Sequence, residues 1–132
     1  MMPREAPIAR DEALHLAGRV AVAMVFMASA VAKGMAFEPE GAGRLEGVFW
    51  VSVGLELVCG GLLLVGLWAR PAAVVLLLWI GVGVVFFHGD LSAEVNRVFT
   101  LANVAIAGGL FVLVAHGGGL LSLDRWRASR AR

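Results

Sequence analysis

Four long apolar runs separated by short polar stretches dominate the hydropathy pattern of this chain. The runs cover residues 14–37, 48–68, 71–87 and 98–116. Their apolar residues are continuous rather than alternating with polar ones, and their lengths suit helices better than the strands of a membrane barrel. About 20 apolar residues are enough for a helix to cross a bilayer. The pattern therefore predicts an all-α membrane protein with four transmembrane helices.

The connections between the runs predict how these helices are joined. Residues 38–47 contain charged side chains, one proline and three glycines, a composition typical of a loop. Pro71 stands where the first turn of a helix tolerates proline, so the sequence WARP is expected to form a tight helix–helix turn. Residues 117–119 are glycines that end the fourth helix. We expect one domain, residues 1–132, built as an antiparallel up-down four-helix bundle, with residues 117–132 as a short basic tail.

The placement of arginines predicts the orientation of the bundle. Arg70 lies in the second connection and four arginines lie in the tail, whereas the first and third connections carry mainly acidic residues. Because basic loops stay in the cytoplasm, both termini are expected on the cytoplasmic side. The sequence MASA at residues 27–30 is similar to a signal-peptidase site. Arg19 lies in or beside the short apolar segment that would precede this site, so we expect the first helix to be retained.

Composition supports the membrane assignment and excludes several functions. Hydrophobic residues make up 60% of the chain, against about 45–50% in a soluble domain. The net charge of +1 gives no indication of nucleic-acid binding. Cys59 is the single cysteine, which excludes an intrachain disulfide, a CxxC redox pair and an all-cysteine iron–sulfur site. Histidines and carboxylates are scattered, so no metal site is expected.

One acidic residue lies in the middle of an apolar run. Glu56 is near the centre of the second run, and an ionisable residue inside a span is a functional hypothesis that needs a partner. On a helix, Ser52, Glu56 and Gly60 share one face, which is small and polar. Faces of this kind meet other helices because small residues let the backbones approach closely. We therefore expect Glu56 to point into the bundle.

Two basic residues in the first run are the candidate partners of Glu56. Arg19 and Lys33 lie near one face of that helix, about 21 Å apart along its axis. Counted from the outer ends of two antiparallel helices, Lys33 lies roughly 6 Å above Glu56 and Arg19 roughly 15 Å below it. Two interpretations stay open. The carboxylate binds a polar headgroup or relays a proton, or it forms a structural ion pair or a protonated acid that is hydrogen-bonded across helices.

Other polar residues have weaker signals. His88, at the outer end of the third run, is either an interfacial histidine in contact with water or a group that titrates near neutral pH. Asn103, in the fourth run, is expected to hydrogen-bond another helix, with a ligand contact as the alternative. His15 and His116 both fall near the cytoplasmic ends of their runs. An axial haem pair there is disfavoured because one adjoins the polar N-terminus and the other the helix-ending glycines.

Three segments, in this order and spacing, resemble a known family. The first is GRVAVAMVFMASAVAKGM, with an early arginine and a late lysine. The second, ELVCGGLLLVGLWARPAAVVLLL, begins at Glu56, and the third, NVAIAGGLFVLVAHGGGLLSLDR, runs from Asn103 to Arg125. Together they are similar to the DoxX family of small bacterial and archaeal membrane proteins. The family commonly has Gly-Pro-Gly where this chain has residues 117–119, and a basic residue where it has Leu120.

The resemblance implies a multi-pass four-helix protein of the bacterial cytoplasmic (inner) membrane. Relatives are described as quinol-oxidase or thiosulfate:quinone oxidoreductase subunits, or as membrane partners of redox-defence enzymes. It thus implies a redox-enzyme partner and a quinone or other lipid-like ligand, with Glu56 and a basic residue of the first helix as polar contacts. No redox centre is visible in the sequence, so electrons are expected from a partner, and catalysis by the chain itself stays open, as does a homo-oligomer.

Two other functions stay open at this point. One is a non-catalytic scaffold or assembly factor that recruits soluble partners, with the basic tail touching acidic lipids or a partner. The other is a small transporter, which the intramembrane charges favour and the absence of broken-helix repeats disfavours.

Overall fold

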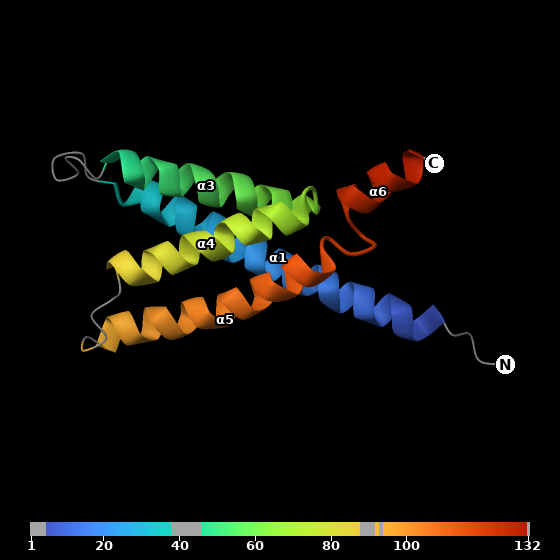
Figure 1. Cartoon of the computed structure of the whole chain (residues 1–132), viewed down its shortest axis with the longest axis horizontal. Helices are drawn as coiled ribbons and strands as arrows, with labels where there is room; N and C mark the ends of the chain where they lie inside the picture. Colours follow the sequence, from blue (N-terminus) through green and yellow to red (C-terminus); the bar gives the residue numbers. More distant parts are fainter. Residues whose placement is uncertain (1–4, 38–45, 88–91, 93, 132) are drawn as a thin grey trace.

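The computed structural model describes residues 5–37, 46–87, 92 and 94–131. Within them the chain forms the helices α1 (Glu5–Met35), α3 (Glu46–Val65), α4 (Ala69–Phe87), α5 (Glu94–His116) and α6 (Leu123–Arg130), and no strand (Figure 1). The first four are long and apolar enough to cross a membrane. The structure therefore confirms the predicted all-α fold with four candidate spans.

The helix boundaries differ from the expected ones for local reasons. Helix α1 begins at Glu5 rather than at residue 14, because residues 5–13 include three alanines and two glutamates, which favour the helix also outside an apolar environment. Helix α5 begins at Glu94 rather than at residue 98, with an acidic side chain at its positive end. Helix α3 ends at Val65 rather than at residue 68, because Gly66 adopts φ +69° and stops the helix.

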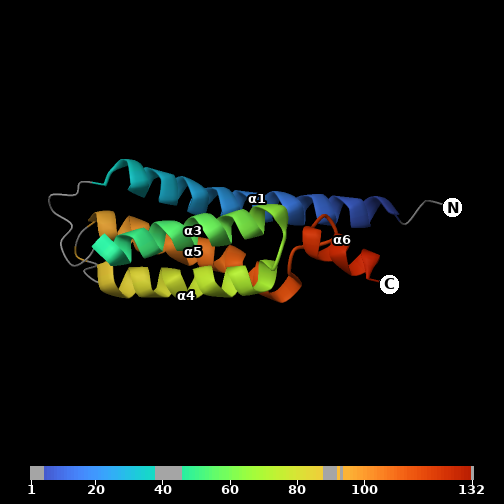
Figure 2. The ribbon, with the colours of Figure 1, turned by 90° about the horizontal axis from the view of Figure 1, so that it is seen from above.

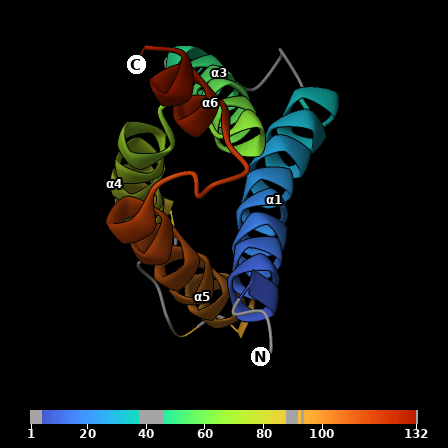
Figure 3. The same cartoon turned by 90° about the vertical axis from the view of Figure 1, so that its right-hand side faces the viewer.

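The four long helices close into a bundle. Helix α1 packs mainly against α3, α3 against α4, α4 against α5, and α5 returns to α1. Figure 3 shows this ring nearly end-on, and Figures 1 and 2 show that α1 extends past the other helices at the end where α6 lies. The start of α1 and the C-terminal helix are therefore at the same end of the bundle, as an even number of spans requires.

Small residues fill the helix contacts. The buried core contains Ala23, Ala30, Ala69, Ala72 and Ala73 beside the larger Leu63, Leu76 and Leu110. A Cβ added to Gly60 would lie 3.1 Å from Met27 Cγ and 3.3 Å from the Ala23 carbonyl oxygen, so this glycine lets α3 lie directly on α1. Close backbone contact of this kind supports association of helices in lipid, where the hydrophobic effect gives little driving force.

Most of the apolar surface faces outward. In the candidate spans only 11–33% of the residues are buried inside the bundle, and large hydrophobic side chains are exposed on all four long helices. Exposed apolar surface of this extent is costly in water and favourable in hydrocarbon. A lipid bilayer is the environment that suits this surface.

The C-terminal segment is more ordered than the basic tail that the sequence indicated. After the glycines at 117–119 the chain turns back and forms α6, which Ser122 caps by accepting a hydrogen bond from the Arg125 amide. Figures 1 and 2 show α6 beyond the ends of α3 and α4.

Candidate functional site

The middle of the bundle contains a cluster of polar side chains around Glu56. Helix α3 carries Glu56, which is 3% exposed, and one turn earlier the buried Ser52. Glu56 Oε1 accepts hydrogen bonds from Lys33 Nζ of α1 at 2.5 Å and from Trp79 Nε1 of α4 at 3.3 Å. Ser52 Oγ donates to the same oxygen at 3.3 Å. Three helices thus converge on one carboxylate oxygen, and Glu56 faces the bundle as expected. We call Lys33, Ser52, Glu56 and Trp79 the Glu56 cluster.

The two oxygens of Glu56 have different surroundings. Oε1 has three donors, whereas Oε2 is buried and has no hydrogen-bond partner among the described residues. A buried acceptor without a partner costs about 1–3 kcal/mol. The structure therefore leaves one oxygen with the capacity to accept a hydrogen bond or hold a proton.

Lys33 connects this buried acid to the outside of the bundle. Its Nζ also donates to Ser52 Oγ at 3.2 Å, which fixes the ammonium between two acceptors. The side chain of Lys33 is 38% exposed, against 4% for that of Glu56. The Glu56 side chain is thus closed off inside the bundle, and Lys33 is the member of the ion pair whose side chain is partly exposed.

Arg19 has other partners than Glu56. It is only 2% exposed, and its guanidinium donates to the Gly118 carbonyl oxygen and, at 2.9 Å, to that of Leu121. Its acceptors are thus two carbonyls of the 117–122 loop. Of the two predicted cations, the structure brings only Lys33 to Glu56, and Arg19 fixes the loop to α1.

Asp124 fixes the same loop to the turn between α3 and α4. Its carboxylate accepts hydrogen bonds from the backbone amides of Trp68 at 2.9 Å and Ala69 at 3.2 Å, and its own amide donates to the Gly66 carbonyl oxygen at 3.0 Å. Trp68 has φ +49°, a left-handed conformation that is unusual for a non-glycine residue. We call the contacts of Arg19 and Asp124 with these segments the loop anchor.

Glycine is required where the loop anchor closes. A Cβ on Gly66 would lie 2.5 Å from Ser122 Cβ and 2.7 Å from a guanidinium nitrogen of Arg19, and a Cβ on Gly118 would lie 2.7 Å from Ser122 Cβ. The glycine run therefore does more than end α5, because it gives the loop enough room to approach both α1 and the α3–α4 turn.

The remaining predicted residues lie elsewhere. His88 is outside the described residues. Asn103 is half-buried on α5 and, within the described part of the chain, makes no hydrogen bond to the Glu56 cluster. His15 and His116 come together with ring centroids 6.4 Å apart in an edge contact. No group of three or more metal-binding side chains occurs in the ranges that the structure describes.

Sequence reasoning missed Trp79 and Asp124. Trp79 lies well inside its span, away from the interfaces where tryptophan is common. Because a buried indole N–H needs an acceptor, this position could have indicated a polar partner inside the bundle. Asp124 stands two residues after Ser122, at the start of a short polar segment that follows a glycine run, a pattern typical of capping.

No protein-family model, curated protein or solved structure matches this chain. The resemblance to the DoxX family stays a prediction from sequence motifs, and the interpretation of the Glu56 cluster rests on its own chemistry.

Proposed function

We propose that the protein is a DoxX-like membrane subunit or accessory partner of a quinone-linked redox complex, and that the Glu56 cluster binds the polar headgroup of the quinone. One observation supports this most directly. A buried carboxylate has one oxygen held by three donors and the other without a partner among the described residues, and the lysine paired with it has a partly exposed side chain.

The residues of the cluster suit such a headgroup. A quinone has carbonyl oxygens that accept hydrogen bonds, and its reduced form has hydroxyls that donate them. Lys33 Nζ is a donor on a side chain that is 38% exposed, and Glu56 Oε2 is an acceptor with no partner among the described residues. One cluster therefore offers a group suited to each redox form.

The chain's own contribution is binding and proton handling. A bound quinone would supply two-electron, two-proton redox chemistry. Ser52 and Trp79 orient the Glu56 carboxyl by donating to Oε1, which leaves Oε2 as the atom at which a proton is held or released. Electrons then come from a partner protein, since the single cysteine of the chain, Cys59, cannot form a disulfide pair or an all-cysteine iron–sulfur site.

The test is purification of the full-length protein from native membranes in a mild detergent, with mass spectrometry of bound lipids and proteins. We expect a quinone to co-purify with the wild type and with Glu46→Gln, a control at the exposed start of the same helix, and to be lost from Glu56→Gln. Equal amounts of co-purified quinone in the Glu56→Gln and Glu46→Gln variants would exclude the Glu56 cluster as the quinone-binding site. No enrichment over an unrelated membrane protein would exclude quinone binding altogether.

A scaffold or assembly factor is the second candidate, and α6 favours it. This helix presents the exposed Arg127 and Arg130, with the Arg130 guanidinium 4.1 Å from the centre of the Trp126 ring. Deleting α6 would also remove Asp124 and with it the loop anchor. Charge substitutions on α6 are therefore the cleaner test. If partners are lost from an Arg127→Gln/Arg130→Gln variant that stays folded, α6 is the docking element; partners that persist exclude it.

A further inference from the structure

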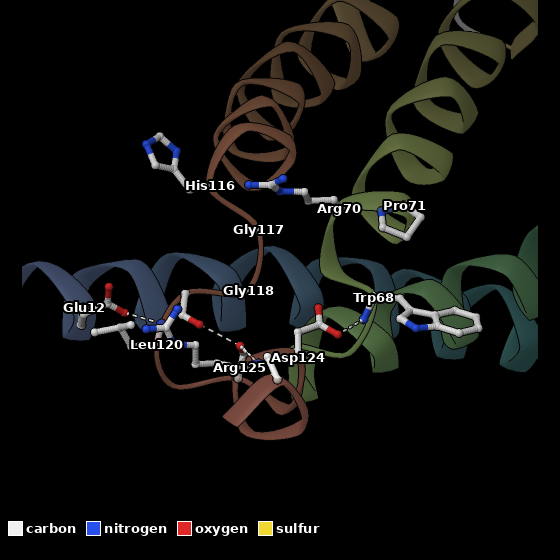
Figure 4. A pocket seen from close by; sticks show the side chains of 13 residues that line it. Glu12, Trp68, Arg70, Pro71, His116, Gly117, Gly118, Leu120, Asp124 and Arg125 are labelled. Carbon is white, nitrogen blue, oxygen red and sulfur yellow. Dashed lines mark hydrogen bonds between the residues drawn. The ribbon is translucent and has the colours of Figure 1, made fainter. Parts of the chain in front are cut away.

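A cavity of about 530 Å³ opens at the end of the bundle that carries α6. Its walls come from the start of α4, the end of α5, the glycine loop and the first turns of α6, with Glu12 of α1 at one edge (Figure 4). In Figure 4, Arg70 lies on the side of α4 and α5, and Arg125 on the side of α6. The cavity is therefore bordered by a guanidinium from each of two opposite walls.

The free hydrogen-bonding capacity of this cavity favours an anion. Two carboxylates and two guanidinium groups line it, and each carboxylate already accepts at least one backbone amide. Asp124 accepts the amides of Trp68 and Ala69, and Glu12 accepts the Leu120 amide at 2.7 Å. Among the described residues, Arg70 donates a single hydrogen bond, to the Ala115 carbonyl oxygen at 3.2 Å. The Arg125 side chain makes no hydrogen bond or ion pair with the described residues. A guanidinium has five N–H donors, so most of these donors are available.

One hydrogen bond and one close approach orient the Arg70 side chain. Besides its bond to Ala115, its Nε lies 3.2 Å from the position that a Cβ on Gly117 would take. Gly117 has φ +74°, a conformation that glycine adopts without strain. An oriented, planar guanidinium recognises phosphate oxygens better than a flexible cation does.

The surroundings of the cavity indicate an anion that is attached to acyl chains. Trp68 at its edge is 63% exposed, and Trp126 on the neighbouring α6 is 51% exposed. The leucines just before and at the start of α6 are exposed as well, namely Leu120, Leu121 and Leu123. Tryptophan and arginine side by side at the ends of apolar helices are typical of the headgroup region of a bilayer. A soluble anion would make no use of this apolar border.

We infer that this cavity binds the phosphate group of an anionic membrane phospholipid, with Arg70 and Arg125 as the two donors. The lipid chains then lie along the apolar outer surface of α4 and α5. This site is separate from the Glu56 cluster and does not depend on the proposed redox function.

The test uses full-length protein in a non-ionic detergent with equal amounts of dioleoyl-phosphatidylglycerol and dioleoyl-phosphatidylcholine, which share acyl chains and differ in headgroup. Native mass spectrometry measures each bound lipid. We expect preferential retention of phosphatidylglycerol, lowered about fivefold by Arg125→Gln. Arg127→Gln, on the same helix but outside the cavity, is expected to leave retention unchanged. Because the Arg125 side chain holds no part of the fold, this variant keeps the test valid if Arg70→Gln misfolds.

Three results would overturn the inference. Equal retention of the two lipids removes selectivity for an anionic headgroup. An equal loss with Arg127→Gln indicates a diffuse attraction to the basic helix rather than a site. Displacement of phosphatidylglycerol by millimolar orthophosphate indicates a site for a free anion, so that the assignment to a lipid fails.

Discussion

Replacing Lys33 by methionine removes the cation from the Glu56 carboxylate while preserving most of the apolar stem. In the wild type, Lys33 Nζ lies 2.5 Å from Glu56 Oε1 and 3.2 Å from Ser52 Oγ. Its loss leaves a buried carboxylate with two neutral donors, Ser52 and Trp79, and no positive charge. Breaking a fully buried ion pair from one side costs about 3–5 kcal/mol. Because the Lys33 side chain is 38% exposed, we expect a loss nearer to about 2–3 kcal/mol.

A double-mutant cycle separates the ion pair from packing. Glu56→Gln keeps the shape of the side chain and removes its charge, so Lys33→Met adds little further destabilisation in a Glu56→Gln background. We expect a coupling energy of about 1–3 kcal/mol between the two sites. The assay is reversible unfolding of the purified protein in mixed micelles, followed by circular dichroism. Lys33→Arg is the control, and it retains most of the stability.

A coupling energy within about 0.5 kcal/mol of zero would refute this reasoning, because it would mean that Lys33 and Glu56 do not interact in the folded protein. Equal destabilisation by Lys33→Arg and Lys33→Met would also contradict it, since the charge would then be irrelevant.

Three further predictions concern the loop anchor, each measured as unfolding free energy or melting temperature in detergent. Arg19→Gln loses charge-assisted hydrogen bonds to two loop carbonyls and lowers stability by about 3 kcal/mol; a wild-type melting temperature would show that the loop is held by other contacts. Asp124→Ala leaves two backbone amides at the start of α4 without their acceptor and lowers the unfolding free energy by about 1–2 kcal/mol. Asp124→Asn keeps one acceptor oxygen and therefore loses less stability. Gly66→Ala is destabilising because of its positive φ and the 2.5 Å approach to a side chain, while Gly61→Ala, with nothing within 4 Å, is neutral or stabilising; equal effects of the two would contradict the close approach.

Much of the fold follows from local properties of the sequence. Continuous apolar runs of membrane length are read from the sequence alone, because the cost of placing polar groups in lipid applies to each segment separately. The inward direction of Glu56 was predictable for the same reason, since a carboxylate on the lipid-facing side is costly wherever the neighbouring helices lie. The proximity of Lys33 followed from the depth of each residue in two antiparallel helices joined by a short connection.

Other features were decided by the tertiary structure. Trp79 reaches Glu56 only because α4 packs against α3 at one particular rotation, which a hydropathy pattern does not specify. Arg19 donates to the carbonyl oxygens of Gly118 and Leu121, which lie 99 and 102 residues later in the chain. Local sequence carries no information on which of several buried carbonyls a cation will meet.

The end of the bundle shows this difference most clearly. The sequence indicated glycines that end a helix, followed by a basic tail, and each of these statements holds for its own segment. Only the folded chain brings Gly66, Gly118 and Asp124 close enough together for the loop anchor to close and for Arg70 and Arg125 to border one cavity. The length of each continuous apolar run determines which segments enter the membrane, because the cost of leaving lipid or entering it is set residue by residue. Close backbone approach and shared hydrogen bonds are properties of pairs, and they exist only once the helices have packed.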